Sequence, residues 1–414
     1  NDFMLALSSL WTYIDLALTP DTMGSGAYAL IDKDGYHYTA YNKTSVVKSF
    51  DDNKLNQPLA PVAHVDVRTL FPKHTANQLD RILGINMTYD GHLVFAASGM
   101  MFVLNRELEL VDHQLFADEQ VENSIALDAN NGIYMVTSKQ MHKLVWTGAR
   151  LSRDAADGAW SSDYDIATTP LPGSLSLGSG TTPSLLGFGP TADKLVVISD
   201  HSADGTNLVA FWRDEIPADH QQKPRTKSTR IAGQHKISIS KATVEASFLT
   251  FDDGVVVINT TYPDPAWINQ DALGNAMLAG TTRAAPMGAQ KFIWNQTENR
   301  FEQAWLRTDI DGSDWMPPSI SPATGLVYLA NRVHNRYEYL AVDWESGKTE
   351  ARWPFPDTSI RWGNWGGVTT LLEDGDLLVG GFFSFTRYNI GIGTDAKIPE
   401  NAAKSVSRLR KIAD

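Results

Sequence analysis

Short apolar segments alternate with tight polar turns along almost the whole chain. From about residue 26 onward, apolar runs of four to eight residues are separated by Asp-Gly, Asn-Gly or Ser-Gly pairs, a pattern typical of short β-strands. Residues 3–18 differ, because their apolar positions are mostly three or four residues apart, which predicts a helix. We therefore expect an N-terminal helical extension over residues 1–25 and an all-β domain over residues 26–414.

The predicted strands recur in a fixed order. A first strand, a tight turn and a second strand are followed by a third strand that ends in an aromatic residue, and then by a fourth. The first turn recurs seven times, at Asp34-Gly35, Asp90-Gly91, Asn131-Gly132, Asp193-Lys194, Asp253-Gly254, Thr324-Gly325 and Asp374-Gly375. Most of these pairs tolerate the positive φ that a two-residue hairpin requires. Seven repeats in 414 residues give about 59 residues each, above the roughly 40–50 of an ordinary propeller blade, so several repeats must carry insertions.

Tryptophan ends the third strand in four consecutive repeats, at Trp146, Trp212, Trp294 and Trp344. A large flat ring at a fixed depth fills the wedge between neighbouring sheets. The repeat predicts a seven-bladed β-propeller, with six or eight blades as alternatives. A β-sandwich pair and a β-helix fit less well, because sandwiches lack a fixed four-strand order and β-helices have shorter, more uniform repeats.

The sixth repeat carries a recognisable blade motif. Residues 341–348 read Ala-Val-Asp-Trp-Glu-Ser-Gly-Lys, and with Trp353 they resemble the blade motif of quinoprotein-like propellers. The fifth repeat, from Trp294 to Trp305, resembles a degenerate copy. The resemblance covers two of seven repeats and involves residues that are structural in the family. It therefore implies the fold of quinoprotein-like and lactonase-like propellers and no particular activity. A quinone would need cationic and stacking residues around the channel, and no such set is identified, so we expect no quinone.

Composition excludes several classes of function. Lys and Arg total 35 against 48 Asp and Glu, a net charge of −13, which disfavours nucleic acid and anionic membranes as partners. No apolar run reaches the roughly 18 residues that would span a bilayer. The chain has no cysteine, which excludes disulfides, thiolate metal sites and cysteine nucleophiles.

The N-terminus gives a prediction about location. The chain starts at Asn1 rather than Met, which indicates processing or trimming, and it has no basic n-region of an intact signal peptide. Absent cysteine and frequent aromatic residues suit an exported bacterial propeller, so we expect a periplasmic or secreted protein, as a monomer or small homo-oligomer.

The architecture predicts where a ligand would bind. In a four-stranded blade, the loop that enters the innermost strand and the loop between the second and third strands lie on one face, over the central channel. Polar residues enter the innermost strands at Glu122, Asn123, Glu245 and Asn364. Carboxylate and amide oxygens are the ligands of calcium, so these four are candidates for an axial Ca²⁺ site. Hydrogen bonds to backbone amides and channel waters are the alternative role.

Catalytic and substrate-binding candidates lie in the same loops. His334 and His201 are the candidate general bases, because histidine titrates near neutral pH. Arg332 and Arg336 are predicted to hold an anionic group, with surface ion pairing as the alternative. The predicted substrate-binding residues are Arg81, Thr182, Trp267, Trp315, Tyr337, Trp365 and Tyr388. The run Asp311-Gly312-Ser313-Asp314 lacks the ligands of a calcium loop and is predicted to be a turn.

Two functions remain open at this stage. The first is a hydrolase or lyase that acts on a small polar molecule or glycan at the channel mouth. The second is a non-catalytic propeller that binds a ligand or a protein on the same face. No nucleophile elbow, zinc-protease helix or dinucleotide fingerprint is present to favour a particular reaction.

Overall fold

A computed structural model describes residues 28–54, 57–71, 78–121, 123–168, 177–202, 205–239, 244–263, 284–358, 362–363, 369–372, 375–380 and 385–388. These ranges hold β-strands, the two short 3₁₀ turns η2 (Val67–Thr69) and η3 (Ala155–Asp157), and no α-helix. The helix expected at residues 3–18 lies outside them. The chain divides into two compact units. Unit 1 holds the described residues up to Ile166 with Arg213–Glu215, and unit 2 holds Ala167–Trp212 and the described residues from Ile216 onward. The single domain expected over residues 26–414 stays a prediction.

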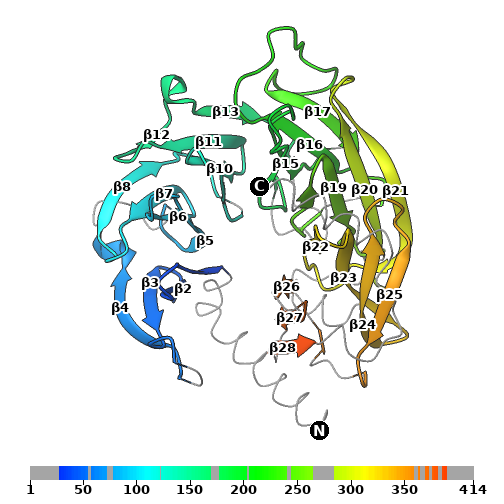
Figure 1. Ribbon diagram of the computed structural model, residues 1–414. Helices are drawn as coiled ribbons and strands as arrows, with labels where there is room; N and C mark the ends of the chain where they lie inside the picture. Colours follow the sequence, from blue (N-terminus) through cyan, green and yellow to red (C-terminus); the bar gives the residue numbers. More distant parts are fainter. Residues whose placement is uncertain are drawn as a thin grey trace. The chain divides into compact units, whose positions relative to one another are not determined.

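Unit 1 contains three antiparallel sheets, each made of consecutive strands (Figure 1). Sheet 1 contains β1 (Ala29–Ile31), β2 (His37–Tyr41), β3 (Ser45–Phe50) and β4 (Ala60–Asp66). Sheet 2 contains β5 (Ile82–Met87), β6 (Leu93–Ala97), β7 (Met100–Leu104) and β8 (Leu110–Leu115). Sheet 3 contains β9 (Ala126–Leu127), β10 (Gly132–Val136), β11 (Gln140–Trp146), β12 (Leu151–Ser152) and β13 (Trp160–Asp163). Both β12 and β13 pair with β11, so the fourth strand of sheet 3 is interrupted by η3.

Unit 2 contains four further sheets of the same kind. Sheet 4 contains β14 (Ser184–Leu186), β15 (Leu195–Ser199), β16 (Asn207–Trp212) and β17 (Ile231–Lys236). Sheet 5 contains β18 (Leu249–Phe251), β19 (Gly254–Ile258), β20 (Met287–Asn295) and β21 (Arg300–Asp311). Sheet 6 contains β22 (Ser319–Ser321), β23 (Leu326–Val333), β24 (Arg336–Asp343) and β25 (Thr349–Pro354). Sheet 7 contains β26 (Thr369–Leu371), β27 (Leu377–Gly380) and β28 (Phe385–Tyr388).

Six of the predicted turns lie where the first strand of a sheet connects to the second, and in the seventh, Asp374-Gly375, Asp374 lies outside the described residues. Asn131 has a φ of 59° and Gly91 a φ of 91°, the left-handed backbone that favours Asn and Gly. The two-residue hairpin is found only in part. Asp252 and Asp253 alone join β18 to β19, whereas the connections at Asp34-Gly35, Asp90-Gly91 and Asp193-Lys194 span residues 32–36, 88–92 and 187–194.

Apolar side chains cover both faces of the inner strands. In β6, Leu93 and Phe95 face the core shared with sheet 1, whereas Val94 and Ala96 face the core shared with sheet 3. Successive side chains of a strand point to opposite faces, so this alternation places sheet 2 between two neighbours. Unit 2 repeats the arrangement, since Val255 packs toward sheet 4 and Val256 toward sheet 6. Each inner sheet is therefore packed face to face between the sheets that precede and follow it in its unit.

The tryptophans at the third-strand ends are buried between sheets, as predicted. Trp146, Trp294 and Trp344 are 2%, 3% and 5% exposed. The indole N–H of Trp146 donates to Asp90 of sheet 2 (3.0 Å), and that of Trp294 donates to Asp193 of sheet 4 (2.8 Å). Both acceptors lie in the connection between the first two strands of the preceding sheet. Each of these two rings thus fills a wedge and ties its sheet to the one before.

Three third-strand lysines make a second kind of tie. Lys48 on β3 donates to the carbonyl of Arg106 (2.9 Å), and Lys291 on β20 donates to that of Trp344 (2.8 Å). Lys143 on β11 donates to the Arg213 carbonyl (3.0 Å). Arg106 follows strand β7 and Trp344 follows strand β24, the third strands of sheets 2 and 6. The Lys48 and Lys291 bonds therefore link a sheet to the one that follows it in sequence.

Candidate functional site

The candidate site in unit 2 forms where β21 leads into β22. Strand β21 ends at Asp311, and a turn closed by the hydrogen bond from Trp315 N to Gly312 O (3.1 Å) follows. A side chain at Gly312 would meet the Asn259 carbonyl at 1.9 Å, so only glycine lets the turn approach strand β19 this closely. Trp315 takes a left-handed φ of 49°. The turn predicted at residues 311–314 is therefore present, and it presents its carboxylates to sheet 6.

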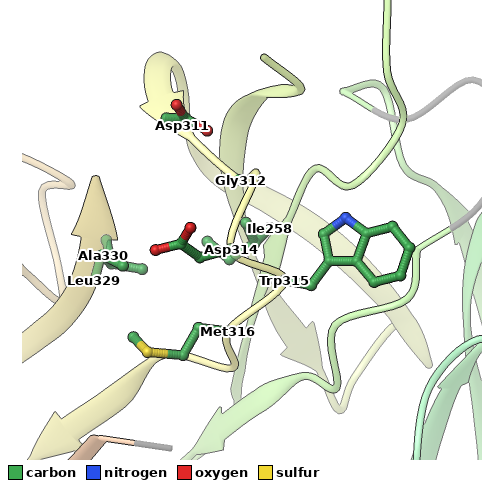
Figure 2. A pocket seen from close by; sticks show the side chains of 8 residues that line it. All are labelled: Ile258, Asp311, Gly312, Asp314, Trp315, Met316, Leu329 and Ala330. Carbon is green, nitrogen blue, oxygen red and sulfur yellow. The ribbon is translucent and has the colours of Figure 1, made fainter. Parts of the chain in front are cut away.

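A pocket of about 210 Å³, including space open to solvent, lies beside this turn (Figure 2). It is lined by Ile258, Asp311, Gly312, Asp314, Trp315, Met316, Leu329 and Ala330. In Figure 2 the side chains of Asp314 and Met316 point toward β23, whereas the indole of Trp315 points the opposite way. The wall toward β23 therefore combines carboxylates with apolar groups.

Arg332 holds one of these carboxylates. Its Nη2 lies 3.1 Å from Asp314 Oδ1, and the two side chains are only 3% and 10% exposed. Arg332 lies opposite Tyr337 in the β23–β24 register, and its guanidinium stands 4.2 Å from the centre of the Tyr337 ring. A guanidinium over an aromatic face is attracted by the ring quadrupole. The cation predicted to hold a substrate anion is thus engaged inside the fold.

Asp311 is fixed by hydrogen bonds that reach across sheet 6. Its carboxylate accepts from the backbone N–H of Ser313 (2.7 Å) and from the Ser313 hydroxyl. Its own N–H donates to Asn331 Oδ1 (2.8 Å), and the Asn331 amide donates to Glu338 (2.7 Å). These bonds hold the turn against the β23–β24 hairpin.

The electrostatics of two tyrosines connect the cluster. Burial raises the pKa of the Tyr337 hydroxyl to about 12, with Arg332 opposing the change and Asp314 adding to it. Burial likewise raises the pKa of Tyr262, and the charges of Asp311 and Asp314 add to that effect. Asp314 is paired with the Arg332 guanidinium, whereas Asp311 is held by hydrogen bonds from Ser313. The pocket wall therefore carries an excess of negative charge.

His201 lies in a separate environment, directly after β15 in sheet 4. It is fully buried, and neither ring nitrogen has a hydrogen-bond partner of standard geometry among the described residues. Burial lowers its pKa to about 4, and the backbone of Leu177 acts weakly in the opposite direction. A neutral imidazole is therefore its stable form at neutral pH.

The remaining predicted catalytic residues lie at the surface. His334 is exposed at the tip of the β23–β24 hairpin, where its φ of 48° and the 65° of Asn335 form the turn. Arg336 is also exposed, and its Nε donates to the carbonyl of Phe355 (2.8 Å). The structure therefore brings Arg332 and Tyr337 together beside Asp314 and places Trp315 in the pocket lining. His334 and His201 lie outside that lining.

The other candidates are distributed over both units. Arg81 is exposed and Asn123 accepts from the hydroxyl of Tyr28 (3.3 Å), both in unit 1. In unit 2 the Thr182 N–H donates to Ser247 (3.1 Å) and the Glu245 N–H donates to Thr260 (2.9 Å). Outside the described residues lie Glu122, Trp267, Asn364 and Trp365, and of Tyr388 only the backbone, in β28, is described. Within the described ranges, no group of three or more His, Asp or Glu side chains is placed to hold a metal ion.

Sequence reasoning missed the two acidic residues of the pocket. Asp311 and Asp314 were assigned to a turn without a function, because their spacing fits no cation-binding loop. The useful signal was their position, directly before the residues Trp315 and Met316 that enter the innermost strand of sheet 6.

Comparisons with known proteins support the fold. No family model matches the sequence. An uncharacterized protein of Archaeoglobus fulgidus is 27% identical over 359 residues, which cover 81% of this chain and 65% of that protein. The chain thus spans less than two thirds of that relative. In the described part, no helix is long and apolar enough to cross a membrane.

Three solved structures have similar folds. Sqt1 of Saccharomyces cerevisiae has a TM-score of 0.52 at 12% identity, over 90% of this chain and 84% of that one. Hydrazine synthase of Kuenenia stuttgartiensis has a TM-score of 0.51 at 13% sequence identity, and the match covers 90% of this chain and 97% of that one. The Dos1 propeller has a TM-score of 0.50 at 12% sequence identity, and the match covers 89% of this chain and 85% of that one. With the successive antiparallel sheets, these similarities confirm a β-propeller fold and the fold-level resemblance seen in the sequence. The count of seven blades stays a prediction that agrees with the seven described sheets.

Proposed function

We propose that this propeller binds a small organic molecule through a cationic or hydrogen-bond-donating end, in the pocket of unit 2. The observation that carries the proposal is the pair of largely buried carboxylates, Asp311 and Asp314, in the wall of a small cavity. Carboxylates accept hydrogen bonds and attract cations, and both effects strengthen as water is removed. Arg332 offsets one negative charge, which leaves one for a ligand.

The size and apolar lining limit the ligand further. The space of about 210 Å³ includes open solvent, so the pocket encloses only one end of a bound molecule. Ile258, Leu329 and Met316 supply apolar contact beside the carboxylates. The pocket suits the cationic or hydrogen-bond-donating end of a molecule whose remainder lies in solvent.

Binding is better supported here than the acid–base chemistry of a hydrolase or lyase. A general base must come within hydrogen-bond reach of the proton it removes. His334 and His201 do not line the pocket, and Arg332 is paired with Asp314. The second sequence hypothesis, a non-catalytic binding propeller, therefore becomes the proposal.

Matched probes test the charge preference. We would measure thermal stabilisation and calorimetric binding with n-butylammonium, 1-butanol and butyrate, which have similar size and different charge. The proposal expects the ammonium to bind best. At ten times its Kd, a ligand specific for the folded state stabilises it by about 1.4 kcal/mol. Equal binding of all three probes, or preference for butyrate, would refute the proposal.

A pair of variants assigns the binding to this pocket. Asp311→Asn removes the charge and keeps an oxygen that can accept from Ser313. It should weaken n-butylammonium binding at least tenfold. Glu350→Gln makes the same charge change at an exposed position of β25 and should leave binding unchanged. If both variants bind like the parent, the ammonium lies elsewhere.

Two sequence predictions remain as additional proposals. We propose a Ca²⁺ ion held by oxygen ligands from Glu122, Asn123, Glu245 and Asn364, because carboxylate and amide oxygens suit this cation. We also propose export to the periplasm or the medium, for which cell fractionation is the direct test.

A further inference from the structure

A serine, a histidine and a glutamate are joined in line on sheet 3 of unit 1. His142 on β11 lies directly opposite Ser161 on β13 in the strand register. The imidazole Nδ1 is 2.7 Å from the Ser161 Oγ, and Nε2 is 2.8 Å from Glu119 Oε2. The proposed binding pocket in unit 2 contains none of these residues.

The proton positions follow from the chemistry of the partners. An ionised carboxylate only accepts hydrogen bonds, so Nε2 of His142 carries a hydrogen, and in the neutral imidazole Nδ1 then holds the lone pair. The Ser161 hydroxyl therefore donates to Nδ1. Burial tends to raise the pKa of Glu119, but hydrogen bonds from His142 and Thr137 more than offset this and lower it. Glu119 is thus a carboxylate at neutral pH, as this tautomer requires.

The three hydrogen-bonded side chains differ in their exposure to solvent, as a nucleophile and its base require. The His142 side chain is 1% exposed and that of Glu119 is 13% exposed, whereas Ser161 is exposed. The Phe116 ring lies 5.1 Å from the imidazole and shields it further. A substrate could reach the hydroxyl while the base and its carboxylate stay fixed and protected from water.

We propose that Ser161, His142 and Glu119 form a nucleophile–base–carboxylate set that hydrolyses small carboxylic esters. A serine hydroxyl is a weak nucleophile until an adjacent base accepts its proton, and a third group must orient that base. The distances and the tautomer meet both requirements. The neighbouring Ser162 does not, because its side chain is buried and its Oγ donates to the carbonyl of Asp163 (3.2 Å).

The reaction balances without a cofactor. Ser161 Oγ bonds to the carbonyl carbon while its proton moves to His142 Nδ1. The tetrahedral intermediate collapses, the ester C–O bond breaks, and the imidazolium gives its proton to the leaving alkoxide. Water then attacks the acyl-serine with His142 as base, which releases the carboxylic acid and restores the hydroxyl. Within the described sheet β13 pairs only with β11 and is therefore an edge strand.

The test uses the full-length protein, a fluorophosphonate probe and p-nitrophenyl acetate. We expect the phosphonate to attach at Ser161, located by peptide mass spectrometry, and ester hydrolysis to be blocked by it. Ser161→Ala should abolish labelling and lower hydrolysis at least 100-fold, within the usual contribution of base-assisted attack. Ser162→Ala, on the same strand and the opposite face, should retain both.

A second variant separates orientation from folding. Glu119→Gln should lower the labelling rate of Ser161 at least tenfold while circular dichroism shows a folded protein. Labelling at another residue, or unchanged hydrolysis in folded Ser161→Ala, would overturn the proposal. Ser161→Ala at an exposed position should not unfold the chain, so loss of labelling reports chemistry. Because this set lies in unit 1, its failure would not affect the ammonium pocket.

Discussion

The buried lysine Lys291 allows a quantitative test of how the sheets are tied. Its side chain is 1% exposed, its Nζ donates to the Trp344 carbonyl, and it stands 3.9 Å from the centre of the Trp344 ring. Its nearest carboxylate, Glu345 at 3.6 Å, is 78% exposed and therefore contributes little. We consider two substitutions, Lys291→Met and Lys291→Ala.

For Lys291→Met, the favourable and unfavourable contributions to the free energy of unfolding nearly cancel. The substitution loses a charge-assisted hydrogen bond of about 1.5–3 kcal/mol and a desolvated cation–π contact of about 2 kcal/mol. It also removes a buried ammonium whose desolvation costs several kcal/mol. The Trp344 carbonyl still accepts from Trp305 Nε1 (3.0 Å), so no buried acceptor is orphaned. We expect a stability change within about 1 kcal/mol for Lys291→Met. Lys291→Ala removes three buried methylene groups and should be about 2.4 kcal/mol less stable than the methionine variant.

The pH dependence gives an independent check. Burial lowers the pKa of Lys291, and Glu345 partly opposes this change. Between the lowered folded pKa and the unfolded value of 10.5, the unfolded chain binds more protons, so the stability of the parent rises with pH. Lys291→Met lacks this rise. The stability of the parent relative to the variant should therefore increase as the pH approaches 10.5. Urea unfolding at several pH values measures both effects. A loss above 3 kcal/mol for Lys291→Met at pH 7 would show that the buried ammonium is a net stabiliser and refute the reasoning.

Four further outcomes are expected. Arg332→Ala should cost about 3–5 kcal/mol, because it leaves the Asp314 carboxylate buried without its cation, and Asp314→Asn in the same chain should recover part of that loss in a double-mutant cycle. The pKa of His201 is about 4 in the folded protein, against an ordinary value of 6.5. The free energy of unfolding should therefore fall by about 3 kcal/mol as the pH drops from 6.5 to 4. His201→Gln should remove this pH dependence in an acid titration. Changing the pair His334-Asn335 to Asn-Gly relieves a left-handed backbone at both positions and should raise stability by about 1 kcal/mol; a large loss in melting temperature would contradict the turn geometry. A chelator should lower the melting temperature if the proposed calcium ion is bound, and unchanged melting would remove that proposal.

The fold was largely predictable because it is local and repeated. Hairpin turns such as Asp90-Gly91 and Asn131-Gly132 mark each repeat by backbone requirements that only a few residues satisfy. Trp146 and Trp294 mark it again through the size of the wedge they fill. Both signals lie within a few residues of the structure they specify, so a single sequence displays them.

The candidate site was less predictable, because it depends on contacts between distant segments. Asp314 and Arg332 are brought together by sheet 6, and the sequence alone gives no reason to pair them. Arg332 was expected near the site because its loop could be assigned to a face, and that expectation stays a prediction; its buried partner could not be identified from the sequence. His334 was favoured for its chemistry and for its place in a loop of the expected ligand face, and its exposure at a hairpin tip became visible only with the strand register.

The serine–histidine pair illustrates a further limit. His142 and Ser161 face each other because the fourth strand of sheet 3 breaks at η3 and resumes as β13. The length of that interruption fixes which serine meets the imidazole. An interruption longer or shorter by one residue would place Ser162 opposite His142 instead. The repeat pattern of the sequence does not show which of the two serines is chosen.

The lysine ties also bear on how the chain is synthesised. The Lys48 and Lys291 acceptor carbonyls lie downstream in the next sheet, at Arg106 and Trp344. Because translation starts at the N-terminus, each lysine is synthesised before the residue whose carbonyl accepts its hydrogen bond. The chain must therefore grow by 58 residues before Lys48 can dock and by 53 before Lys291 can dock. Chains grow at roughly 5–20 residues per second. The nascent propeller would accordingly gain stability in steps of two sheets at these points, and a pause between the paired sheets would prolong the interval in which a lysine-bearing sheet is open to solvent.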